Sequence, residues 1–161
     1  MLISDKIAAA FNAQIGHEFG NELQYLAIAA YFDAERLFGL AKIFYKQAQE
    51  EHEHGMKFLK FLLDADAEVE IPASPAPRNS FSSAEDAAQA AFDLETKTTN
   101  LINGLMDLAI AEKNYMAQVF LQWFVTEQLE EMATATDRLA VIKRAGPNVL
   151  MVEAYIAHNA G

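Results

Sequence analysis

The sequence predicts an all-α protein, an antiparallel four-helix bundle with one long crossover and a short fifth helix at the C-terminus. Proline placement is the first observation behind this prediction. Three of the four prolines lie between residues 72 and 77 and the fourth is Pro147, so residues 1–71 and 78–146 permit long helices. The second observation is periodicity, because apolar residues recur every three or four positions rather than alternating.

Each helix has boundaries that can be read from this pattern. Ser82 or Ser83 caps the third helix, and acidic residues fill its first turn. Pro147 follows Gly146, which is typical of a helix start. The five predicted helices span residues 5–33, 38–65, 84–112, 115–143 and 147–158.

The lengths of the connections predict the topology. The first and second helices, like the third and fourth, are joined by only a few residues, which makes each pair an antiparallel hairpin. Residues 66–83 form a crossover rich in Pro, Ser and Ala. Fully extended, this crossover reaches about 60 Å, whereas a helix of this length measures about 42 Å. It can therefore run the length of the bundle, which makes residues 1–161 a single domain. The alternative, two helical hairpins on a floppy linker, is weaker because neither hairpin would bury both of its apolar sides.

Composition excludes several classes of protein. The chain has 161 residues, 52% of them hydrophobic, which is enough for a substantial core. The absence of Cys excludes disulfide scaffolds, iron–sulfur clusters and thiol nucleophiles. A net charge of -11 disfavours nucleic acid and anionic membranes as partners. With no long apolar run and an acidic residue near the N-terminus, we expect a cytoplasmic protein with no nucleic-acid or membrane partner.

Acidic side chains interrupt the apolar row of every long helix. The four acids, one per helix, are Glu18, Glu51, Glu95 and Glu131. An unpaired buried carboxylate costs several kcal/mol, so four would exceed a typical stability of about 5–15 kcal/mol. The nearest basic residue on these rows is Arg138, two turns beyond Glu131. A bound cation cluster accounts for this pattern, and a buried network of protonated carboxyls is the alternative.

The types of ligand narrow the choice of metal. Several carboxylates and one imidazole, that of His54, form a hard, oxygen-rich set suited to iron, manganese or zinc. The spacing Glu51-x-x-His54 places two donors on one helix face. Facing glutamates would bridge two ions about 3.5–4 Å apart. The residues therefore predict a two-metal site inside the bundle.

Four segments together carry a resemblance to a known family. They are Gly16-His17-Glu18-Phe19 followed by Tyr25, the run from Ala48 to His54, Leu94-Glu95, and the run from Phe120 to Glu131. On these segments the chain resembles the ferritins, specifically the haem-free bacterial type, within the ferritin-like di-iron family. The resemblance covers nearly the whole chain.

This resemblance implies a di-iron ferroxidase centre in each subunit. Glu18, Glu51 and His54 would hold one iron. Glu51 would bridge to a second iron, completed by Glu95 and Glu131.

The resemblance also assigns residues around the two irons. Gln128 would lie beside the second iron and orient water or dioxygen, and Tyr25 would hydrogen-bond a carboxylate ligand. Trp123 matches an aromatic residue near the centre that is sometimes assigned to electron donation. A third iron site on the cavity side would use Glu50, Glu127 and Glu130.

The implied function is iron storage and detoxification. Fe(II) would be oxidised to Fe(III) by O2 or H2O2 and deposited as mineral inside a shell of twenty-four subunits, with the fifth helix around the four-fold axes. Exposed aromatics would be buried between subunits; the candidates are Phe38, Phe61, Phe81, Tyr115 and Tyr155. The alternatives are a di-iron oxygenase or peroxidase acting on another substrate, and a metal-free structural bundle.

Departures from neighbouring families sharpen the assignment. Bacterioferritins use a second Glu-x-x-His motif, but here the corresponding residues are Gln128-Leu129-Glu130-Glu131. Their haem-binding methionine corresponds to His52, so no haem is expected. Mini-ferritins lack an intramolecular site and the fifth helix, and rubrerythrins need cysteines that this chain does not have.

Overall fold

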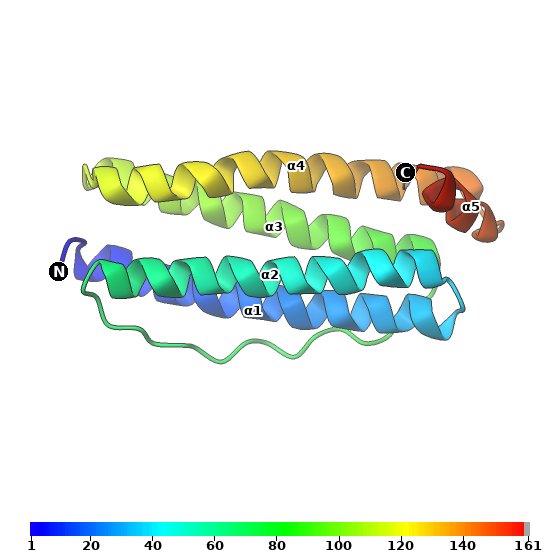
Figure 1. The fold of residues 1–161 in the computed structure, drawn as a ribbon, viewed down its shortest axis with the longest axis horizontal. Coiled ribbons are helices and arrows are strands. Elements are labelled where there is room, and N and C mark those ends of the chain that lie inside the picture. The colour runs from blue at the N-terminus through cyan, green and yellow to red at the C-terminus, as the bar shows by residue number, and fades with distance from the viewer. Residues whose placement is uncertain (160–161) are drawn as a thin grey trace.

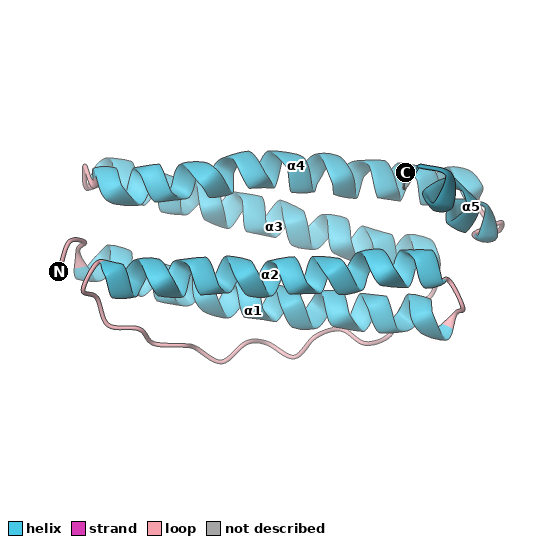
Figure 2. Cartoon of the chain, in the orientation of Figure 1, coloured by secondary structure: helices cyan, strands magenta, loops and turns pink. Residues whose placement is uncertain are grey.

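The computed structural model describes residues 1–159, which form helices without strands (Figures 1 and 2). The helices are α1 (Asp5–Ala34), α2 (Phe38–Asp64), α3 (Ala84–Ala111), α4 (Tyr115–Ala145) and α5 (Leu150–Asn159). The predicted fold class is confirmed. The largest difference lies at α5, which begins at Leu150 rather than at 147.

Local chemistry explains where these helices begin and end. Ser4, Ser83 and Asn114 cap α1, α3 and α4, each accepting a hydrogen bond from the backbone N–H three residues later. Gly146 ends α4 with a φ of 55°, a conformation that favours glycine. The turn after Gly146 contains Pro147, which is why this proline precedes α5 instead of lying in its first turn.

The crossover runs along the outside of the bundle from one end to the other, so α2 and α3 are parallel (Figure 1). Side chains of α1 hold its backbone. The Asn12 side chain donates to Glu68 O at 2.9 Å and accepts from Glu70 N at 2.8 Å. Gln24 makes the same pair of bonds with the backbone of Arg78, both at 2.9 Å. The long segment is thus bound to the bundle by hydrogen bonds rather than left as a linker.

The hydrophobic core is divided into two clusters. The first, which we call the α5-end cluster, surrounds Phe32 and Phe44 and includes Val152 of α5. The second, the N-terminal cluster, surrounds Phe11 and Phe58 at the opposite end of the helices. On every long helix the interrupting glutamate lies between the residues of these two clusters. The middle of the bundle is therefore a polar layer between two apolar ends.

The aromatic residues predicted to face outward divide into two groups. Phe38, Tyr115 and Tyr155 are exposed, as expected. Phe61 and Phe81 instead pack within the chain: Phe61 stacks on Phe120 at 4.4 Å between ring centroids, and Phe81 packs edge-on against Tyr31 at 5.5 Å. The prediction was wrong for these two because a neighbouring aromatic ring covers each. Within residues 1–159, no helix has both the length and the apolar character needed to cross a membrane.

Candidate metal centre

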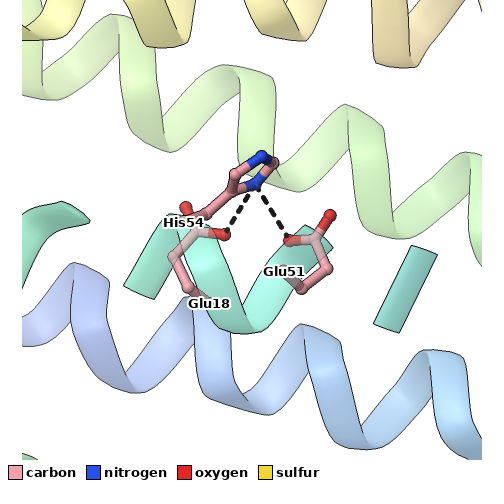
Figure 3. A group of neighbouring side chains, drawn as sticks. All are labelled: Glu18, Glu51 and His54. Carbon is pink, nitrogen blue, oxygen red and sulfur yellow. Dashed lines mark ion pairs between the residues drawn. The ribbon is translucent and has the colours of Figure 1, made fainter. Parts of the chain in front are cut away.

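Three side chains that could bind a metal converge in the first half of the polar layer (Figure 3). Glu18 comes from α1, and Glu51 and His54 come from successive turns of α2. The Nδ1 atom of His54 lies 3.7 Å from Glu51 Oε2 and 3.9 Å from Glu18 Oε2. All three side chains are buried, and one donor atom from each lies within 4.8 Å of the others. This arrangement matches the set predicted for the first iron.

The second half of the polar layer contains side chains from all four long helices. Tyr25 donates its hydroxyl hydrogen to Glu95 Oε1 at 2.5 Å, and Gln128 donates to Glu95 Oε2 at 3.1 Å. Glu131 is held by Gln47, which donates to Glu131 Oε2 at 2.8 Å and to Glu51 Oε1 at 3.2 Å. The amide of Gln47 therefore lies between Glu51 and Glu131, both of which would bind the second iron.

Sequence reasoning missed an outer layer of amides around the carboxylates. Gln14 donates to Glu18 Oε1 at 2.8 Å, in addition to the bonds from Gln47 and from Asn21, described below. A signal for two of them was present, because Gln14 and Gln47 each precede their carboxylate by four residues on the same helix face. An amide side chain three or four residues from a buried acid on a helix thus predicts a hydrogen bond to that acid.

Within the described chain, no Lys or Arg forms an ion pair with the centre. Among residues 1–159, no Lys or Arg nitrogen lies within 4.0 Å of the four buried glutamates. Arg138 instead lies over the Phe44 ring, 5.5 Å from its centroid. The Oε2 atom of Glu18 is buried without any hydrogen-bond donor. A buried carboxylate oxygen without a donor fits an added cation, since leaving it unpaired is costly.

Without metal, protons reduce the charge. Burial and the neighbouring carboxylates Glu95 and Glu51 raise the pKa of Glu131 to about 9. Burial and the charge of Glu51 raise the pKa of Glu95 to about 7, despite the bonds from Tyr25 and Gln128. The pKa of Glu18 is likewise raised well above its ordinary value, by burial and by Glu51.

The pair Glu51 and His54 behaves differently. Burial raises the pKa of Glu51, but hydrogen bonding and charge from His54 outweigh that effect and lower it. Burial also opposes protonation of His54, yet its contacts with Glu51 raise the pKa of the imidazole. The metal-free centre thus combines a charged pair with protonated carboxyls, and a metal would displace those protons.

A second group of potential ligands adjoins the first. His54 Nε2 lies 4.0 Å from Glu127 Oε1, and these two residues form a group with Glu131. Within the described chain, neither Glu50 nor Glu130 belongs to a cluster of three such ligands within 4.8 Å. Glu50 is half-buried and Glu130 is exposed. The conformation thus brings Glu127, but not the other two residues of the predicted third site, to the edge of the centre.

An aromatic side chain contacts His54 at the edge of the centre. Trp123 packs edge-on against the His54 ring at 5.5 Å between centroids, and it is 42% exposed. Lys57 Nζ lies 3.9 Å from the centroid of the Trp123 ring on its outer side. Trp123 therefore contacts the centre directly, as the predicted location of this residue required.

Comparisons with known proteins identify the family of the chain. A family model described as "Ferritin-like domain" matches residues 8–145. "Ferritin BfrB" of Mycolicibacterium smegmatis is 40% identical over 155 residues, covering 96% of this chain and 86% of that protein. "Bacterial non-heme ferritin" of Staphylococcus aureus is 34% identical over 145 residues, covering 90% and 87%. The open pore ferritin of Archaeoglobus fulgidus superposes with a TM-score of 0.93 at 32% identity, covering 96% of each chain. The chain therefore belongs to the ferritin family.

Proposed function

We propose that this protein stores and detoxifies iron by oxidising Fe(II) at the centre formed by Glu18, Glu51, His54, Glu95 and Glu131. The observation that carries the proposal is the burial of four glutamates beside one histidine with no Lys or Arg in contact. Iron-binding carboxylates require such a convergence of oxygen atoms, whereas a structural bundle gains nothing from it. Membership of the ferritin family supports iron storage as the role.

The chain contributes positions and charge to the reaction. Glu51, with its lowered pKa, is available as an anion for the first Fe(II), and His54 must release a proton before its Nδ1 can bind. Entry of two Fe(II) ions displaces protons from Glu95 and Glu131, the carboxyls whose pKa is raised. Each Fe(II) then loses one electron, and dioxygen or hydrogen peroxide accepts the pair of electrons. Gln128 faces Glu95 and would orient the oxidant or a water molecule beside the second ion.

The product leaves toward the acidic edge of the centre in this proposal. Glu127 lies 4.0 Å from His54 and is partly exposed, which supports a role as the first residue to receive Fe(III). Glu50 and Glu130 would extend this third site once an ion draws them together. Ferric mineral would then form inside a hollow shell of twenty-four copies, the assembly implied by the resemblance to bacterial ferritins.

Addition of Fe(II) in air, followed by absorbance, tests this function. We expect oxidation faster than in buffer alone, followed by retention of many more than two irons per chain. An oxygenase would stop near two irons per chain, and a metal-free structural bundle would show no rate above buffer. Either result would overturn the proposal.

Substitutions assign the activity to the centre. Glu51→Ala and His54→Ala should abolish fast oxidation while the assembled shell remains, because both residues serve as ligands. Glu53→Ala is the matched control, since Glu53 lies between them on α2 but is exposed. Glu127→Ala should slow only the turnovers after the first. Normal oxidation by both ligand variants would contradict the assigned roles.

A further inference from the structure

A chain of hydrogen bonds leads away from Glu51 between α1 and α3. Asn21 donates one amide hydrogen to Glu51 Oε2 at 3.2 Å and the other to Thr98 Oγ1 at 3.0 Å. Beyond Thr98, the Nε2 atom of His17 lies 2.8 Å from the same hydroxyl oxygen. The proposed function uses none of these three residues.

The direction of each bond follows from the threonine. Thr98 Oγ1 donates its only hydrogen to the backbone oxygen of Leu94 at 2.9 Å. Its lone pairs therefore accept from Asn21 Nδ2 and from an Nε2–H group on His17. The orientation of the Asn21 amide is thus fixed from the side opposite the centre.

Both oxygens of Glu51 are held in this way. Oε2 accepts from Asn21 of α1, and Oε1 accepts from Gln47 of α2. The two donors come from different helices and bond different oxygens of the carboxylate, which restricts its rotation. Oε2 is the oxygen that lies 3.7 Å from His54 Nδ1 and faces the first iron position. The bond from Asn21 therefore acts on the oxygen nearest the other ligands.

Asn21 is buried, and both of its side-chain N–H groups are hydrogen-bonded. It is only 1% exposed, and an amide in that position is costly unless its hydrogens are bonded. Both bonds from its side-chain nitrogen go to the polar layer. Asn12, also buried on α1, differs, because its side chain bonds only the backbone of the crossover.

We propose that Asn21 is a positioning residue for Glu51, held in orientation by Thr98 and His17, and that it raises the affinity of the first metal position. This inference rests on the proposed function for the identity of the metal, but its test measures metal affinity and does not require iron oxidation. Partners that orient metal ligands typically change metal affinity by about 10–100-fold when they are removed. A change of this kind alters binding itself and not only the rate of oxidation.

Titration of the metal-free full-length protein with Co(II), followed by its visible absorbance, tests the inference. Asn21→Ala should weaken binding at the first position by about tenfold or more. Thr98→Val should weaken it in the same direction, and Thr98→Ser, which keeps the hydroxyl, should restore it. The two losses should not add in the double variant, since both substitutions release the same carboxylate. If Asn21→Ala does not fold, the Thr98 pair alone decides.

Asn12→Ala is the matched control. It should lower the melting temperature by freeing the crossover, yet leave Co(II) affinity unchanged. Parental affinity in Asn21→Ala or Thr98→Val, or an equal loss of affinity in Asn12→Ala, would overturn the inference while leaving iron oxidation intact. A parent that binds Co(II) but does not oxidise Fe(II) would overturn the proposed function instead, and the comparison of affinities would still decide the role of Asn21.

Discussion

At the scale of single residues, the centre shows how one protein tolerates four buried acids before metal arrives. Burial and neighbouring carboxylates raise the pKa of Glu131, Glu95 and Glu18 and so favour their protonated forms, whereas contacts with His54 lower the pKa of Glu51. Buried protonated carboxyls, the alternative to bound cations in the sequence, thus describe the same side chains without metal. In the proposed function, the two interpretations would be successive states of one site, connected by proton release.

Stability of the metal-free protein should consequently depend on pH. The pKa of Glu131 is about 9 in the folded protein and near 4.5 in the unfolded chain. Between these values the folded state binds the extra proton, so the free energy of unfolding falls as pH rises. Glu131→Gln removes this ionisable group. Between pH 5 and 9 the free energy of unfolding of the variant should therefore rise relative to that of the parent, by at most about 1.4 kcal/mol per pH unit.

Melting temperatures measured at pH 5, 7 and 9 with a chelator present would check this expectation. Glu130→Gln is the control, because Glu130 is the adjacent residue on α4 and is exposed. An advantage for Glu131→Gln that shrinks with rising pH would contradict the assigned protonation.

At the scale of elements, α2 begins without a cap of its own. Leu37 offers no side-chain acceptor, and the Gly39 N–H instead donates to Glu153 Oε1 of α5 at 3.1 Å. An anionic side chain also suits the positive end of the helix dipole. The fifth helix thereby completes the second, and Val152 beside Glu153 is buried in the α5-end cluster. Sequence reasoning assigned α5 wholly to contacts between subunits, but part of its apolar face is buried within the chain.

Gly39→Ala should detach this contact. A Cβ at Gly39 would clash with Glu153 Oε2, so we expect the carboxylate to move away from the Gly39 N–H and the cap to be weakened. Loss of a helix cap costs about 1 kcal/mol. We expect a lower melting temperature and faster proteolysis after α4.

Gly104→Ala provides the comparison with Gly39→Ala. Nothing lies within 4 Å of a Cβ at Gly104, and this glycine is in the interior of α3. Its replacement should stabilise the protein by about 0.5–1 kcal/mol through helix propensity alone. Equal effects of the two substitutions would contradict the role of Glu153.

At the scale of the whole molecule, the fold was largely predictable because it depends on patterns that survive in one dimension. Proline placement defined the crossover, and periodicity defined four helices within two residues of their observed ends. The buried glutamates were predictable because an acid in an apolar row is conspicuous. Asn21 and Thr98 were not, because a polar residue near such a row is ordinary until a second helix shows what it contacts. The predicted start of the fifth helix at Pro147 was wrong because Gly146 and Pro147 form a turn before α5 begins at Leu150.

Exposed apolar side chains on α4 predict association of copies. Tyr115, Met116 and Val119 are 72%, 57% and 68% exposed, and they lie within about one turn of one another. Val119→Glu should place a charge in this patch and reduce the assembly to smaller species with unchanged helix content. Light scattering and circular dichroism measure the two properties. Thr136→Glu, at an exposed position further along α4, is the control and should leave the assembly at the parental size.

The division of the core into two apolar clusters has a mechanical consequence. Without metal, the ends of the bundle are connected across the middle mainly by neutral hydrogen bonds and one charged pair, so the midsection should open to solvent exchange before either end does. Two ions bound by ligands from all four long helices would stabilise that midsection. In the proposed function, binding of iron would therefore also reduce local opening of the bundle.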